Sequence, residues 1–102
     1  MTRDELESLV QQGEVISGLD CRGQDYSGLD LSGGVFSDVD LSNAKFVAAM
    51  LNECVFNECR LNSADFSDAS MEVVAISGCD LSSALLKNAR LASVNIIEST
   101  ID

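Results

Sequence analysis

Apolar residues recur at every fifth position of the chain, from Ile16 to Ile101. Eighteen consecutive positions follow this rule, and all four phenylalanines lie on it. The residue two places before each is mostly small, as at Ala44, Cys59 and Ala64, and the other three positions are mostly Asp, Asn, Ser or Gly. The series is Ile16, Cys21, Tyr26, Leu31, Phe36, Leu41, Phe46, Leu51, Phe56, Leu61, Phe66, Met71, Ile76, Leu81, Leu86, Leu91, Ile96 and Ile101.

A period of five fits neither an α-helix, with 3.6 residues per turn, nor a strand, which repeats every two residues. Five residues suit one straight side followed by one corner. Strand alternation then points the large residue and the small residue two places before it to the same side, which must be the interior. Asp, Asn, Ser and Gly suit the corners, because they bond local backbone groups or adopt unusual dihedral angles.

The small residues indicate how many sides make one coil. Alanine returns every 20 residues in two series, Ala44, Ala64 and Ala84, and Ala49, Ala69 and Ala89. We therefore expect four pentads per coil, with residues 20 apart stacked in columns. The pentads then make about 4.5 coils, whose side chains fill the interior and leave no ligand cavity.

Three segments carry a family resemblance: Leu29-Asp30-Leu31-Ser32, Ala64-Asp65-Phe66-Ser67 and Cys79-Asp80-Leu81-Ser82. They resemble the A(D/N)LXX signature of pentapeptide-repeat proteins, and the likeness covers residues 14–102. The resemblance implies an all-β fold, a right-handed quadrilateral parallel β-helix with a solid core. The departures from the pattern are Glu14, Gln24 and Gly34 at small inward positions and Cys21 and Tyr26 at large ones.

The first residues follow another pattern. Thr2 and Glu5 fit a capping box, and Gly13 suits the end of a helix. We predict a short α-helix over residues 2–12 that caps the first coil, in preference to an independent functional helix. The chain then divides into a capping helix, 1–13, and a repeat domain, 14–102. The apolar stripe of the helix is Leu6, Leu9 and Val10.

The other end shows no such cap, because the pentads run to Ile101 and the sequence stops at Asp102. An uncovered coil exposes a β edge and apolar core residues, which favours association. Three explanations stay open: a fragment of a longer chain, end-to-end pairing of two columns, or tolerance of a charged end. Self-association through the open C-terminal coil is therefore one expected contact.

The charge balance excludes several classes of function. Acidic residues outnumber basic ones 17 to 6, the net charge is −11, and histidine is absent. We expect no direct binding to nucleic acid or to anionic membranes, and no histidine-dependent catalysis. No apolar run is long enough to span a membrane, and the charged N-terminus is unlike a signal peptide, so we expect a cytoplasmic protein.

The four cysteines, Cys21, Cys54, Cys59 and Cys79, all fall at inward positions. They lack CxxC spacing, so we expect no metal or other cofactor. Cys59 and Cys79 should be neighbours in one column, but parallel side chains do not favour a disulfide. The cysteines are predicted to be small buried core residues.

Two surface columns are candidates for binding. Asp20, Asp40 and Asp80 share one wall with Arg60 between them. A convex wall provides no pocket for acid–base catalysis, but it could attract a basic partner. A second column holds Val15, Val35, Val55 and Ala75 where Asp or Asn is usual, and such an exposed apolar stripe is a candidate interface.

The sequence therefore predicts a non-enzymatic protein–protein interaction module or scaffold with an unknown protein partner. The segment from Gly13 to Asp20 is similar to repeat domains of bacterial secretion-associated proteins, including type VI adaptors. The alternative implied by the family is a DNA mimic that inhibits or protects a type II topoisomerase such as gyrase. The charge agrees with mimicry, but the column is short, and Lys45, Arg60 and Arg90 interrupt its acidic columns.

Overall fold

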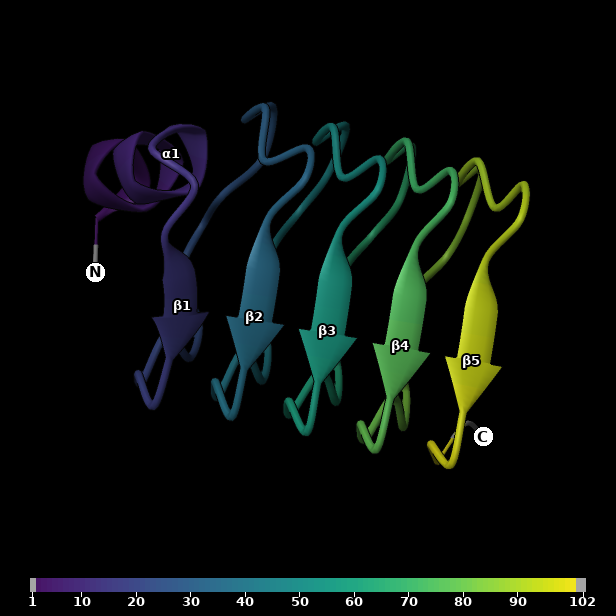
Figure 1. The fold of residues 1–102 in the computed structure, drawn as a ribbon. Helices are drawn as coiled ribbons and strands as arrows, with labels where there is room; N and C mark the ends of the chain where they lie inside the picture. The colour runs from purple at the N-terminus through teal and green to yellow at the C-terminus, as the bar shows by residue number, and fades with distance from the viewer. Residues whose placement is uncertain (1, 101–102) are drawn as a thin grey trace.

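A computed structural model describes residues 2–100 as one helix followed by a parallel β-solenoid (Figure 1). Neighbouring strands pair in chain order, and each residue pairs with the one 20 positions later, as Val15 does with Val35. The coil therefore contains four pentads, as the alanine series predicts. The elements are α1 (Arg3–Gln11), β1 (Val15–Ser17), β2 (Val35–Ser37), β3 (Val55–Asn57), β4 (Ala75–Ser77) and β5 (Asn95–Ile97).

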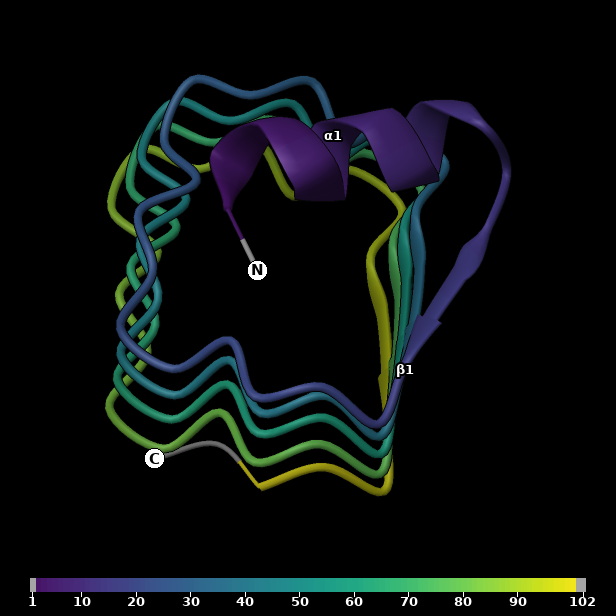
Figure 2. The same cartoon turned by 90° about the vertical axis from the view of Figure 1, so that its left-hand side faces the viewer.

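Seen from the N-terminal end, the coils form a square that turns clockwise as it recedes, so the solenoid is right-handed (Figure 2). This confirms the predicted fold class. We call the side made by β1–β5 the strand face. The other three sides carry single parallel bridges, and we name them the Asp20, Asp25 and Asp30 faces after their first bridged residues.

Every corner depends on one residue with a left-handed backbone. A positive φ recurs at every fifth residue from Gly13 (79°) to Glu98 (52°), and from Gly18 onward this residue lies two places after an inward side chain. On the three bridged faces the next N–H returns to the inward residue's carbonyl, as Ala44 does to Leu41 at 3.0 Å. A left-handed third residue is typical of a type II turn. Glycine fills six of these corners, and Asp, Asn, Ser and Glu fill most of the rest.

The aspartate before an inward residue has a structural role at the turn. The Asp25 carboxylate accepts a hydrogen bond from the Ser27 N–H at 3.0 Å, and Asp65 accepts one from Ser67 at 2.9 Å. This is the Asx arrangement, which satisfies a backbone donor that points away from the coil. The repeated Asp–apolar–Ser triplet therefore stabilises the turn where it occurs.

The core consists of stacked inward side chains. The Phe36 and Phe56 rings stack with centroids 5.0 Å apart, and those of Phe46 and Phe66 lie 5.2 Å apart. Gly34 makes room for the first pair, because a Cβ at this position would lie 2.8 Å from the Phe36 ring. Glycine in a small inward position thus compensates for the large ring beside it.

Two of the other departures from the repeat are exposed. Glu14 and Gln24 occupy small inward positions of the first coil but face solvent. No coil precedes the first one, so these positions have no neighbouring layer to bury them. Cys21 and Tyr26, at large inward positions, are fully buried.

Helix α1 covers the first coil (Figure 2). Thr2 and Glu5 form the predicted capping box. Leu6 and Val10 are buried, and Leu9 packs against the core. The Arg3 guanidinium donates to the Asp25 carbonyl at 3.0 Å and holds the helix over the coil.

The inward residues of the last described coil lack such a cover. Leu86, Leu91 and Ile96 are 36–42% exposed, whereas Phe66, Met71 and Ile76, one coil earlier, are buried. An apolar hollow of about 240 Å³ lies between these residues. The expectation of a cavity-free interior therefore does not hold at this end. Ile101, the last residue of the apolar series, lies outside the described residues.

One corner residue is poorly suited to its backbone. Val73 has φ 60°, which is strongly disfavoured for a β-branched side chain, and it is 58% exposed. We expect Val73→Asn to raise the free energy of unfolding by about 1 kcal/mol and the melting temperature by roughly 4–8 °C, because Asn tolerates this region. Thermal unfolding followed by circular dichroism measures the effect.

Val55→Asn is the matched control for this prediction, because Val55 is exposed but lies in β3, outside the residues with positive φ. Here Asn loses strand propensity and should not stabilise the fold. An equal gain from both substitutions would contradict corner strain at Val73.

Candidate interaction surfaces

The strand face is an exposed sheet without charge. In each strand from β1 to β4 the middle side chain is buried, and the two flanking side chains face outward. Val15 is 59% exposed and Val55 36%, while Ile97 of β5 is 49% exposed. The predicted column is present, because Val15 pairs with Val35, Val35 with Val55 and Val55 with Ala75. Its role as an interface stays a prediction.

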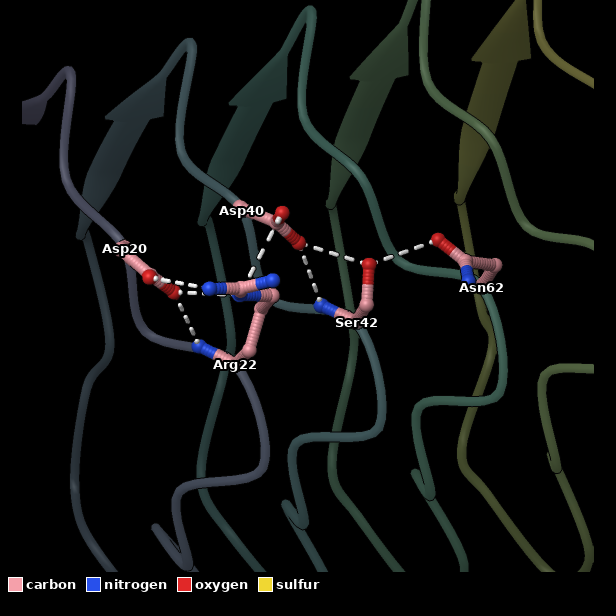
Figure 3. Close-up of polar contacts among 5 residues, drawn as sticks. All are labelled: Asp20, Arg22, Asp40, Ser42 and Asn62. Atoms are coloured by element: carbon pink, nitrogen blue, oxygen red, sulfur yellow. Dashed lines mark hydrogen bonds and ion pairs between the residues drawn. The ribbon is translucent and has the colours of Figure 1, made fainter.

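The Asp20 face contains a polar network (Figure 3). The Arg22 guanidinium donates to both oxygens of the Asp20 carboxylate, at 2.9 and 2.7 Å, and lies 3.9 Å from that of Asp40. The Ser42 hydroxyl donates to the Asp40 carboxylate at 2.6 Å and also lies 2.8 Å from the side-chain oxygen of Asn62. The network thus joins residues that lie 20 positions apart in the chain, and it extends over three coils.

This network changes the character of the predicted acidic wall. Asp20, Asp40 and Asp80 lie in one bridged column with Arg60 between Asp40 and Asp80. The hydrogen bonds from Arg22 lower the pKa of Asp20 to about 2. The wall therefore alternates acidic and basic groups. The sequence interpretation placed Arg60 correctly but missed Arg22, whose long side chain reaches back to the preceding residues.

The carboxylates of this wall are also unsuited to general acid catalysis. The Ser82 N–H and hydroxyl donate to Asp80 and lower its pKa, so it stays ionised near neutral pH. The depression beside Asp20, of about 330 Å³, is open and mixes four carboxylates with Arg22 and Arg60. A general acid requires a site that excludes water, and this surface is open to solvent.

All four cysteines are buried free thiols. The Cys59 N–H lies 3.3 Å from the Cys79 sulfur, as expected for neighbours in one column. The contact between these two thiols, together with burial, raises the pKa of Cys59, and the same contact lowers the pKa of Cys79. Burial raises the pKa of Cys54 to about 12. Cys79 is only 3% exposed, so its sulfur lies inside the core, away from solutes.

Residues 2–100 form neither a metal-binding cluster nor a membrane-spanning helix. No group of three or more Cys, Asp or Glu side chains there is arranged to hold a metal ion. The helix in this range is also too short and too polar to cross a bilayer.

Residues 24–102 match the family described as Pentapeptide repeat region. The chain therefore belongs to the pentapeptide-repeat family, as its sequence motifs predicted. No match was found among curated proteins.

Solved structures show the same fold. The pentapeptide repeat protein Rfr23 from the cyanobacterium Cyanothece 51142 aligns with a TM-score of 0.82 at 19% identity, covering 87% of this chain and 61% of Rfr23. A trypsin-treated variant of QnrB1, a plasmid-mediated fluoroquinolone resistance protein, aligns with a TM-score of 0.70 at 24% identity, covering 83% of this chain and 51% of that protein. The chain thus spans about three fifths of the length of Rfr23 and about half of the length of QnrB1.

Proposed function

We propose that this protein is a non-enzymatic interaction module that binds another protein through the strand face. The observation that carries the proposal is an exposed, uncharged sheet on a chain with a net charge of −11. The other three faces carry charged residues at the same outward positions, as at Asp20, Lys45 and Glu72, so the repeat does not require neutrality there. Exposed apolar surface of this kind is typical of protein interfaces.

The proposal extends to the setting of the module. Its N-terminal segment is similar to repeat domains of type VI adaptors, which suggests a role in a secretion assembly. A rigid solenoid suits such a role, because it presents flat walls without an ordering cost on binding. A cytoplasmic location stays part of this prediction.

Replacing Val35 and Val55 together with Lys should abolish partner binding and leave the circular dichroism spectrum unchanged, because both side chains point outward. A photo-cross-linking amino acid at Asn57, on the same face, reports contacts in the native host. We expect a discrete adduct, identified by mass spectrometry, that disappears in the double variant.

Met50→Lys with Leu85→Lys is the matched control, because it adds the same two charges at exposed apolar residues on the Asp30 and Asp25 faces. This variant should keep the adduct. If the adduct survives the Val35 and Val55 substitutions, the strand face is not the binding surface.

We also propose that two copies pair through the last described coil. Leu86, Leu91 and Ile96 are partly exposed there, and the end of the column has a cross-section of roughly 24 × 22 Å. Two such ends bury about 1,000 Å², which is near the lower limit for a specific interface. Since α1 covers the other end, pairing closes as a dimer and does not propagate as a fibre.

Leu91→Asp with Ile96→Asp should shift such a dimer to monomer in sedimentation equilibrium, because pairing would bury two carboxylates. Met50→Asp, at an exposed residue on another face, should leave the association unchanged. A wild-type chain that stays monomeric at high concentration contradicts the pairing.

The alternative function is DNA mimicry toward a type II topoisomerase. The likeness to QnrB1 and the net charge of −11 favour it. Against it, the longest dimension is 31 Å, less than one turn of B-DNA at about 34 Å, and Lys45 and Arg60 interrupt the acidic columns.

Mimicry predicts that the chain inhibits DNA supercoiling by gyrase, and that added salt weakens the inhibition steeply, because the attraction is electrostatic. Val35→Lys with Val55→Lys should not selectively remove the effect, since the acidic faces would carry it. Absence of inhibition at low salt contradicts this alternative.

A further inference from the structure

We infer that the partner of the strand face is a flat β-sheet of another protein with an aliphatic centre and lysine or arginine along its edge. This inference rests on the proposed function and adds the chemistry of the partner.

The spacing of the strand face suits a sheet. In the end-on view β2–β5 lie over one another along a straight side, whereas β1 leaves that line near α1 (Figure 2). The Val35, Val55 and Ala75 side chains are stacked one per strand, so they repeat about every 4.8 Å. The strands of a second sheet have the same spacing, and aliphatic rows of two sheets interdigitate when the strands are nearly aligned.

The strand face has no charge of its own. Its outward residues are Val15, Ser17, Val35, Ser37, Val55, Asn57, Ala75, Ser77, Asn95 and Ile97. The Ser and Asn side chains offer hydrogen bonds beside the aliphatic column. A charged side chain in the centre of the partner would lose its hydration without gaining an opposite charge.

The edge where the strands end is acidic. The corner column after β1–β5 consists of Gly18, Asp38, Glu58, Gly78 and Glu98. The Glu58 carboxylate lies over Gly78, where any Cβ would overlap it, and this places the charge along the edge. Among residues 2–100 no ion pair involves Asp38, Glu58 or Glu98, although Asp38 and Glu58 line the same open depression as Arg22 and Arg60.

A second copy of this chain does not fit the description of the partner, because its own edge is acidic. If the strands of two apposed faces run in the same direction, the order of the coils is reversed, so Glu58 lies against its own counterpart while Asp38 and Glu98 lie against Gly78 and Gly18. If they run in opposite directions, this column lies against the edge that contains Glu53. Both arrangements bring carboxylates together, and such like-charge contacts oppose association. The fitting partner therefore has the same sheet spacing and the opposite edge charge.

A copy of the chain with a reversed edge provides the probe for this inference. It carries Asp38→Lys, Glu58→Lys and Glu98→Lys. Three reversals of two charges each bring its net charge from −11 to −5, so both molecules stay negative and bulk attraction does not explain binding. We expect the wild-type chain to bind the reversed copy at least tenfold more tightly than it binds itself. The strand face is small, so about 100 µM protein is needed in the titration.

Three controls accompany the titration. A copy with Asp4→Lys, Glu7→Lys and Asp68→Lys has the same net charge away from the strand face and should not bind more tightly than wild type. Val35→Lys with Val55→Lys in the wild-type partner should remove the gain. Circular dichroism verifies that each variant is folded. Pairing through the last coil does not involve Val35 or Val55, so the loss of the gain in the Val35→Lys, Val55→Lys partner separates binding by the strand face from that pairing.

The inference is overturned if the folded reversed copy binds no better than wild type, or if the control with the same net charge binds equally well. Failure of the proposed function is a separate result, because there the cross-link at Asn57 gives no adduct that depends on Val35 and Val55. An adduct with a helical or acidic partner would retain the proposed function and overturn only the partner chemistry.

Discussion

The structure depends on a single backbone constraint, which is a left-handed residue at every fifth position. From Gly13 to Glu98 each of these residues turns the chain through one corner. This spacing fixes the length of each side, and the length of the side decides which two side chains of the pentad point inward. The core and the outward columns therefore follow from the corners. Because the corner is costly for most side chains, the sequence concentrates Gly, Asn, Asp and Ser at this position.

Stacking at 20-residue intervals places identical positions about 4.8 Å apart, so any charge would repeat along a column. The sequence reduces this repulsion by alternating the sign. Lys45 lies between Asp25 and Asp65, and Arg60 lies between Asp40 and Asp80. Arg22 bonds to Asp20, near the column that Arg60 interrupts. The net charge of −11 is thus distributed over corners and bridged faces, and the acidic corner column after the strands lacks such alternation.

The fold could be predicted from the sequence because the repeat makes inward positions visible as a period. The apolar series and the Ala44–Ala64–Ala84 interval gave the five-residue side and the four-sided coil. The reach of Arg22 was not visible, since it depends on a side-chain conformation. The conformation of Val73 was hidden because its residue type contradicts its backbone. The exposure of Glu14 did not follow from the period, because burial also requires a neighbouring layer.

The candidate interface was only partly predictable, because it depends on outward positions that folding leaves free. The repeat accepts Asp20, Lys45 or Glu72 beside an inward residue, so no rule of the solenoid requires neutral side chains from Val15 to Ile97. The valine column could be read from the letters, but the flat sheet and the acidic corner along it needed the fold. A property that the fold does not require, present in five successive strands, is the observation on which the proposed contact with another protein rests.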